Sequence, residues 1–167
     1  MNSNTVILMI SFVVLVLVQV LFLSNMFLFG FVNPMIYLLF LVIYRFDNDQ
    51  TLFIFLSFIL GFCIDFLSQS GGAHTIASLT IGFLRPLLIK YSFGVTSEIP
   101  SNFQDDSRTR NKYIFLALLV VIHHLLYFIV VYYSWGATYL ILKNTILTSV
   151  FSLILISLLF HFFKKIK

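Results

Sequence analysis

The chain has 167 residues, of which 60% are apolar and 18% aromatic, and its formal net charge at pH 7 is +4. Only 10% of the residues are charged, whereas an ordinary soluble domain has about 25%. This composition excludes a water-soluble globular fold and predicts an integral membrane protein solvated by lipid. Nucleic-acid binding is not expected, because the basic residues stand at the ends of apolar runs and form no stripe with aromatic residues.

Six apolar runs predict a single all-α domain, a polytopic bundle of about six transmembrane helices. A helix needs roughly 20 apolar residues to cross a bilayer, and the predicted helices cover residues 5–24, 28–45, 50–69, 72–91, 113–134 and 139–163. The runs are continuously apolar and do not alternate with period two, which excludes a β-barrel. The first run has no basic stretch before it and no small-residue cleavage site, so we expect it to stay in the mature chain.

The second predicted helix is interrupted near its start by Asn33 and Pro34. Proline fits best in a first helical turn, and a helix that begins there would keep roughly a dozen residues, too few to cross unaided. The residues alone leave two alternatives. Either residues 27–32 form a kinked extension of a spanning helix, or the helix is short and shielded by its neighbours.

Basic residues concentrate on one side of the predicted bundle. That side holds Arg45, Lys90, Arg108, Arg110, Lys112, Lys164, Lys165 and Lys167, while the opposite connections have only Lys143 near them. Short cytoplasmic loops carry an excess of lysine and arginine. We therefore expect the C-terminus to be cytoplasmic, and the N-terminus as well if the second helix spans.

Residues 93–112 form the only sizeable polar stretch, with glycine, proline and charges of both signs. Such a composition, without apolar periodicity, predicts a flexible cytoplasmic loop. The loop is either a solvated connector or a docking and regulatory site.

Ionisable residues inside the third and fourth helices are the strongest candidates for a functional role. A charge near a helix centre costs roughly 2.5 to 3.5 kcal/mol, so each one needs a partner or a function. One face of the third helix carries Ser57, Gly61 and Asp65, and one face of the fourth carries His74, Ser78, Gly82 and Arg85. The pattern predicts either a satisfied intramembrane polar network or a surface that recognises a partner or ligand.

Gly71 and Gly72 predict a tight turn between these two helices, and small residues such as Gly61 and Gly82 let helices pack closely in lipid. Folding the hairpin about this turn puts Asp65 and His74 at one depth, about one turn below the extracytoplasmic surface. We expect these two residues to hydrogen-bond or pair.

Arg85 lies about 12 Å deeper than Asp65 at 1.5 Å per residue, so a direct bridge between them is not expected. Pro86 follows it and cannot donate to the carbonyl of Gly82, which frees an acceptor and permits a kink. We expect Arg85 to snorkel toward the cytoplasm or to bind such carbonyls.

His123 and His124 in the fifth helix would suit a metal or proton transfer, but adjacent helical residues point about 100° apart. No HExxH motif or Cys/His cluster accompanies them, so we expect interhelical hydrogen bonds and no metal or other cofactor. The polar line of Asn144, Thr148 and Ser152 predicts hydrogen-bonded packing. No G-x-S-x-G, S-x-x-K or phosphate-binding glycine loop is present, and the sequence predicts no enzyme.

The run GFCIDFLSQSGGAHTIASLTIGFLRPLLIK, residues 61–90, resembles the central signature of the MreD family of rod shape-determining membrane proteins. The shared features are a glycine and an aspartate near the end of one helix, a small-residue turn, and a helix that ends in Arg-Pro. LFGFVNP after the first helix and HHLLYF in the fifth also look like that family. The resemblance covers nearly the whole chain.

The resemblance implies a non-enzymatic component of the bacterial elongation machinery in the inner (cytoplasmic) membrane, and it favours a second helix that spans. Its expected partners are an MreC-like single-pass protein and, through it, MreB, a RodA-type glycosyltransferase and a penicillin-binding transpeptidase. It would couple peptidoglycan synthesis to cell shape. The family is similar in fold to the S components of energy-coupling-factor vitamin transporters, so the alternative function is a substrate-binding membrane subunit of such a transporter.

Overall fold

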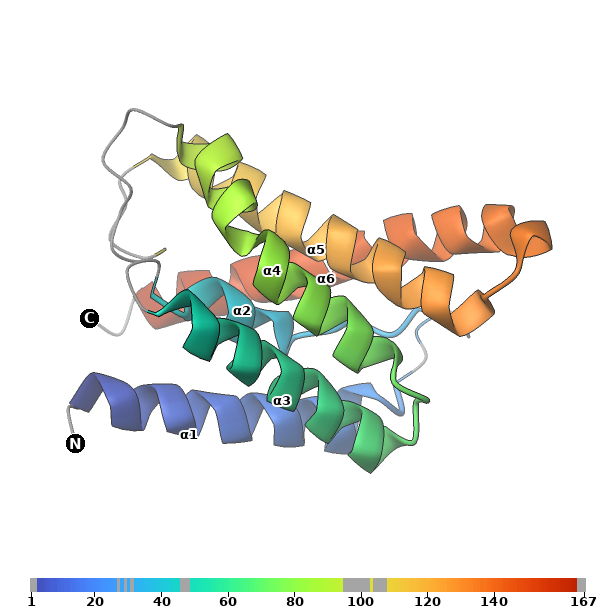
Figure 1. The fold of residues 1–167 in the computed structure, drawn as a ribbon, viewed down its shortest axis with the longest axis horizontal. Helices are drawn as coiled ribbons and strands as arrows, with labels where there is room; N and C mark the ends of the chain where they lie inside the picture. Colours follow the sequence, from blue (N-terminus) through green and yellow to red (C-terminus); the bar gives the residue numbers. More distant parts are fainter. Residues whose placement is uncertain are drawn as a thin grey trace.

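The computed structural model describes residues 3–26, 28, 30, 32–45, 49–94, 103 and 108–164, and these form an all-helical bundle (Figure 1). Five helices in these ranges are long and apolar enough to cross a membrane. They are α1 (Ser3–Val18) with its π-helical extension η1 (Gln19–Leu23), α3 (Gln50–Ser68), α4 (Ala73–Phe93), α5 (Thr109–Tyr132) and α6 (Thr138–Lys164). The prediction of a polytopic helical bundle is confirmed.

The prediction of a spanning second helix over residues 28–45 is wrong. Among the described residues of that range only α2 (Leu38–Ile43) is helical. Six residues rise about 9 Å at 1.5 Å per residue, far less than a bilayer core. Asn33 and Pro34 lie in irregular chain before it. Proline has no N–H to donate and disfavours helix at the residue before it. The bundle thus has five helices of spanning length in its described part, and the alternative of a short, shielded helix is the one that the structure adopts.

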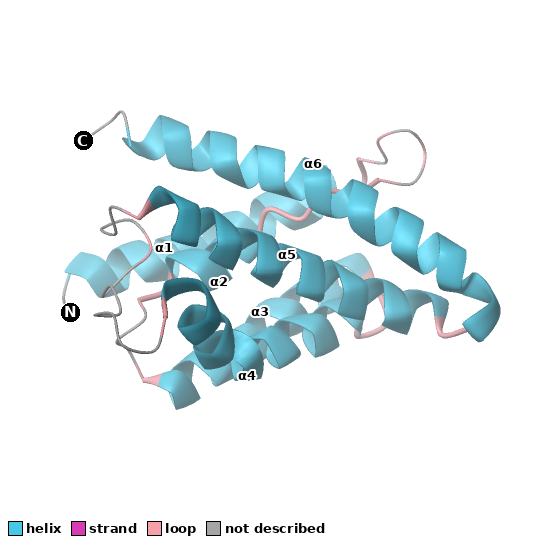
Figure 2. Ribbon diagram, turned by 90° about the horizontal axis from the view of Figure 1, so that it is seen from above, coloured by secondary structure: helices cyan, strands magenta, loops and turns pink. Residues whose placement is uncertain are grey.

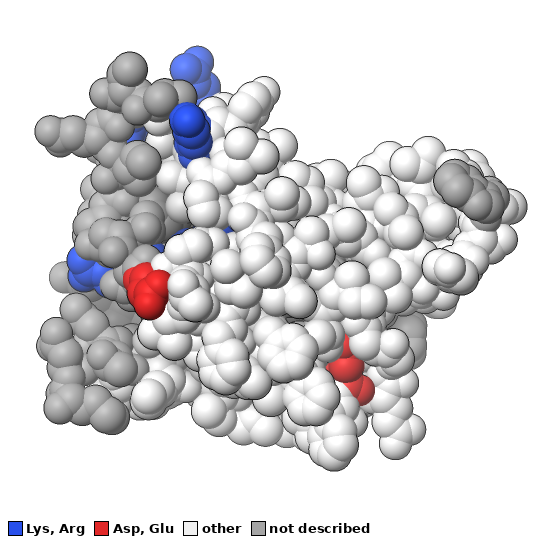
Figure 3. Space-filling view, viewed as in Figure 1, with Lys and Arg blue, Asp and Glu red and all other residues white. Residues whose placement is uncertain are grey.

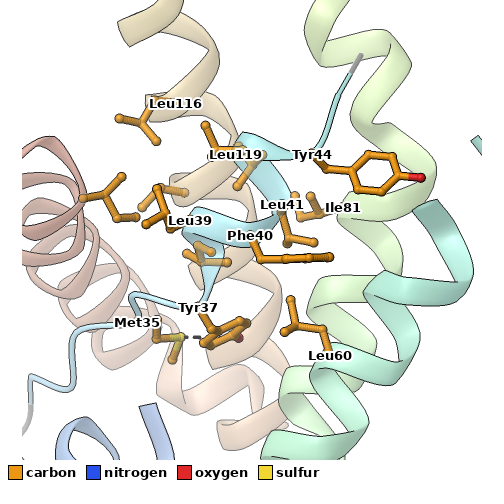
Figure 4. Close-up of a cluster of buried hydrophobic side chains, with 14 of the residues drawn as sticks. Met35, Tyr37, Leu39, Phe40, Leu41, Tyr44, Leu60, Ile81, Leu116 and Leu119 are labelled. Atoms are coloured by element: carbon orange, nitrogen blue, oxygen red, sulfur yellow. Dashed lines mark hydrogen bonds between the residues drawn. The ribbon is translucent and has the colours of Figure 1, made fainter. Parts of the chain in front are cut away.

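The interrupted segment is tolerated because protein surrounds it. Non-helical backbone occurs at membrane depth only where it is buried in protein or lines a water-filled cavity. All side chains from Met35 to Val42 are buried, and α2 lies in the middle of the bundle (Figure 1). Figure 4 shows the segment's side chains against residues of α3, α4 and α5, namely Leu60, Ile81, Leu116 and Leu119.

Two helices flank the predicted loop more closely than expected. Helix α4 ends at Phe93, and α5 begins at Thr109 rather than at residue 113. Most of the predicted flexible loop, residues 95–102 and 104–107, lies outside the described residues. Phe103 between them is buried, with its ring centroid 4.8 Å from that of Phe160 and 6.2 Å from that of Phe115. Phe103 therefore packs against both α5 and α6.

Both chain ends lie at the same end of the bundle (Figure 1), and the lysine and arginine side chains on the same face gather there (Figure 3). Seen from above, α5 and α6 run side by side along one edge (Figure 2), in agreement with their direct packing. The outward faces of the long helices carry exposed apolar side chains, among them Phe22, Phe66, Phe83 and Ile146. Such faces suit contact with lipid rather than water.

Helices α3 and α4 form the most closely packed pair of the bundle. A Cβ atom added to Gly61 would lie 2.5 Å from the carbonyl oxygen of His74, and one added to Gly82 would lie 3.2 Å from Cβ of Ser57. The turn between the helices contains Gln69, Gly71 and Gly72 with positive φ angles of 53°, 72° and 92°. Glycine adopts such angles without steric cost, so Gly71 and Gly72 favour this turn.

We expect Gly61→Ala to destabilise the protein by about 1 to 3 kcal/mol, because the added methyl group meets main chain that cannot rotate away. The loss should appear as a lower midpoint in thermal unfolding of the purified protein in detergent. Gly136→Ala is the matched control, since the nearest atom to its Cβ would be 3.7 Å away and its φ is not positive. Equal midpoints for the two variants would contradict the close contact of α3 with α4.

Candidate functional site

The carboxylate of Asp65 caps the beginning of α4 from the preceding helix. Its Oδ1 atom accepts hydrogen bonds from Oγ of Ser70 (2.6 Å) and the main-chain N–H of His74 (3.1 Å). Its Oδ2 atom accepts from the N–H (2.7 Å) and the hydroxyl (2.5 Å) of Thr75. The first N–H groups of a helix have no partner within the helix and favour negative charge. Asp65 therefore does the work of an N-cap, a position that Gly72 occupies without a side chain.

Asp65 and His74 are hydrogen-bonded, but through the main chain of His74 and not through its ring. The imidazole points instead to the hydroxyl of Tyr37, with Nδ1 2.8 Å from Oη. Matching depth in the hairpin was enough to bring the two residues together. It did not determine which atoms would meet.

Arg85 binds the carboxyl end of α2. Its Nη1 donates to the carbonyl of Arg45 (3.2 Å) and its Nη2 to that of Tyr44, and its guanidinium carbon lies 4.2 Å from the ring centroid of Phe53. The last carbonyls of a helix have no partner within it and favour positive charge. Arg85 is almost completely buried, so it binds carbonyls and does not snorkel to the membrane surface.

The carbonyl of Gly82, which Pro86 leaves without its helical donor, has a partner from another helix. Nε2 of Gln50 in the first turn of α3 donates to it at 2.7 Å, and α4 continues through Pro86 to Phe93. Sequence reasoning missed Gln50. In the hairpin Gly82 lies beside Ser57, whereas Gln50 is at the beginning of α3, about two helical turns away from Ser57. Gln50 reaches the carbonyl of Gly82 only because its side chain is long.

Polar side chains hold the backbone of the interrupted segment. The amide of Gln19 accepts from the N–H of Ile36 (2.9 Å) and donates to the carbonyl of Pro34 (3.3 Å), as a peptide group of a neighbouring strand would. Oγ of Ser152 in α6 accepts from the N–H of Met35 at 3.0 Å. These bonds replace the helical ones that the segment lacks, as burial in a membrane requires. Gln19 was not among the predicted site residues.

The Tyr37 hydroxyl joins two buried histidines. It lies 2.8 Å from Nδ1 of His74 and 2.9 Å from Nε2 of His123, and Oγ of Ser78 is 3.4 Å from the same nitrogen of His123. A hydroxyl has one proton, so the Tyr37 hydroxyl can donate to at most one of the two histidines. The three residues from the segment, α4 and α5 therefore form one connected unit.

His124 belongs to a second chain of hydrogen bonds. Its Nδ1 is 2.7 Å from the carbonyl oxygen of Val120, which can only accept, so Nδ1 carries a proton. In the neutral ring Nε2 then accepts from Ser152, whose oxygen is 3.2 Å away. The bonds run in one direction, from the N–H of Met35 through Ser152 and His124 to Val120. The expectation of interhelical hydrogen bonds for His123 and His124 agrees with these contacts.

The predicted site residues fall into separate internal groups. His74 and Ser78 meet around His123 and Tyr37, Asp65 caps α4 beside them, and Arg85 lies at the end of α2. All four predicted polar residues are buried, which supports the network interpretation over an open recognition surface. Among the residues that the structure describes, no three His, Cys, Asp or Glu side chains are placed to hold a metal ion.

The polar line of α6 agrees only in part with hydrogen-bonded packing. Asn144 donates to the hydroxyl of Tyr132, and Ser152 takes part in the His124 chain. Thr148 is fully buried, and its hydroxyl has no partner among the described residues. For that residue the expectation is wrong.

Comparisons with known proteins give no assignment, because no family model, no curated protein and no solved structure matches the chain.

We expect Asp65→Asn to lower the free energy of unfolding by about 2 kcal/mol, because the amide cannot accept from all four donors and its NH₂ group meets main-chain N–H groups. The measurement is unfolding in detergent at neutral pH. Asp49→Asn is the matched control, since exposed Asp49 caps α3 with one bond to the N–H of Thr51. A smaller loss for Asp65→Asn than for Asp49→Asn would contradict the capping role.

We expect Arg85→Met to destabilise the protein by about 3 kcal/mol although it removes a charge from the membrane, because the buried carbonyl of Tyr44 and the partly buried carbonyl of Arg45 lose a charged donor. Lys90→Met removes a charge from the same helix at an exposed position and should change stability by about 0.5 kcal/mol or less. The unfolding midpoints of both variants provide the comparison. If Arg85→Met were the more stable of the two, Arg85 would not hold α2.

Proposed function

We propose that this chain is a non-enzymatic membrane scaffold of the bacterial cell-elongation machinery, which couples peptidoglycan synthesis to cell shape. Support comes first from residues 61–90, whose sequence resembles the MreD family. The signature residues Gly61, Asp65, Arg85 and the Gly71-Gly72 turn all serve one hairpin and its contact with α2.

The observation that carries the proposal is where the polar groups of the bundle are used. Asp65, Arg85 and the histidines bind backbone groups and one another inside the bundle, while the outward helix faces remain apolar. Because these polar side chains hold the fold together internally, the bundle presents large apolar faces to its surroundings. Such a body can pack against the transmembrane helix of another protein, where association depends on shape and close contact.

The proposed partner is an MreC-like single-pass protein, and through it MreB, a RodA-type glycosyltransferase and a penicillin-binding transpeptidase. We place the chain in the bacterial inner membrane with both termini in the cytoplasm. Although α2 is too short to span as a helix, the interrupted segment as a whole leads back toward the end of the bundle where α1 begins (Figure 1). The two termini share one end of the bundle with most of the basic side chains in view (Figures 1 and 3). An excess of lysine and arginine is typical of cytoplasmic ends.

A substrate-binding subunit of an energy-coupling-factor transporter is the second candidate. One observation favours it. Interrupted helices line substrate sites in many transporters, and here Tyr37 of the interrupted segment meets His74 and His123 in the interior.

Purification of the tagged chain from its native membrane in mild detergent tests the two candidates. The scaffold proposal expects a stoichiometric single-pass protein with a coiled-coil ectodomain, identified by mass spectrometry. A small molecule that co-purifies stoichiometrically, in the absence of such a protein, would overturn it in favour of transport.

Photocrosslinking in cells locates the contact. A photoreactive phenylalanine analogue replaces one exposed aromatic residue at a time, at Phe22 in η1, Phe66 in α3, Phe83 in α4 or Tyr139 in α6. We expect one helix face to give a crosslink to the single-pass partner, and the same substitution at the fully buried Phe53 to give none. Crosslinks to lipid alone from every exposed position would contradict a helix-docking scaffold.

A further inference from the structure

Three hydroxyl groups on the inward face of α6 are buried without a hydrogen-bond partner among the described residues. They belong to Thr145, Thr148 and Ser149, which are at most 4% exposed. Buried polar groups in proteins almost always have a partner, and where protein supplies none an internal water molecule is the usual one. Three such groups within two helical turns therefore point to a bound species.

The three hydroxyls do not make the local hydrogen bond that serine and threonine often make within a helix. A serine or threonine in a helix can donate to the carbonyl four residues earlier, and elsewhere in this chain they do so. Ser57 donates to Phe53 and Thr80 to Ile76, both at 2.7 Å. The α6 hydroxyls make no such bond, so they are oriented away from the local acceptor and remain available to another group.

Two further buried polar atoms have no hydrogen-bond partner among the described residues. They are Oδ1 of Asn33 and Nδ1 of His123. The main chain of Met35 is hydrogen-bonded to Ser152. Asn33 lies about 7 Å before Met35 along extended chain, and Thr148 lies about 6 Å before Ser152 along the helix, so the two offsets are similar. The segment and α6 run in the same direction (Figure 1). His123 lies on another side of α5, where its Nε2 meets Tyr37 and Ser78, so only Asn33 is placed near the α6 hydroxyls.

We propose that ordered water molecules occupy the seam between the interrupted segment and α6, and that they hydrogen-bond to the three α6 hydroxyls and to Oδ1 of Asn33. The hydroxyls can donate and accept, the Asn33 oxygen can only accept, and no charged side chain is among them. These polar atoms suit a small neutral molecule that can both donate and accept hydrogen bonds, and water is such a molecule. The proposal is independent of the scaffold function, because a hydrated interior is compatible with either candidate role.

Radiolytic hydroxyl-radical labelling of the folded protein in detergent tests the seam, because the radicals form from water next to the side chain that they oxidise. Met35 is 1% exposed, whereas Met9 in the apolar face of α1 is 54% exposed and Met26 beyond α1 is 50% exposed. We expect oxidation of Met35 and Met26 but not of Met9. Oxidation of Met26 alone would overturn the proposal.

Paired variants sharpen the test. Thr148→Val and Ser149→Ala together should reduce Met35 oxidation to the level of Met9 and lower the unfolding midpoint, since the waters lose ligands. Ser57→Ala removes a buried hydroxyl that has a protein partner and should leave Met35 oxidation unchanged. An unchanged or raised midpoint in the α6 variant, as expected when hydroxyls are removed from a dry core, would overturn the proposal.

Discussion

A lipid bilayer offers no hydrogen bonds to the backbone, and this constraint explains most of the polar residues in the bundle. The segment before α2 is not helical, so its N–H and C=O groups need partners from elsewhere. Gln19 and Ser152 supply them for residues 34–36, and Arg85 supplies them at the end of α2. Buried polar side chains thus take the place of the missing backbone hydrogen-bond partners.

The hairpin of α3 and α4 obeys the same constraint at its turn. The N–H groups that begin α4 are bound by Asp65, and the carbonyl that Pro86 leaves is bound by Gln50. Close approach at Gly61 brings the carboxylate within reach of these donors. A charged residue inside the membrane is therefore compatible with a purely structural role when a helix end lies opposite it.

The sequence allowed the hairpin to be predicted because its information is local. The positions of Asp65 and His74 follow from a short turn and the helical rise, and the small residues indicate close packing. Gln19, Gln50 and Tyr37 could not be selected, because their partners lie 15 to 86 residues away and no local pattern marks them. The second helix was misassigned because apolar composition fits a lipid-facing span and a buried, interrupted segment equally well, and burial depends on neighbours that come later in the chain.

The hydrogen bond between Met35 and Ser152 joins positions 117 residues apart and has a consequence for biogenesis. When residues 32–43 leave the ribosome, the serine that binds them has not yet been synthesised, and their single short helix cannot cross a bilayer alone. The segment therefore reaches its final place only after α6 has been inserted. Assembly of this bundle must end with closure of the last hairpin around an early segment, rather than proceed strictly from the first helix to the last.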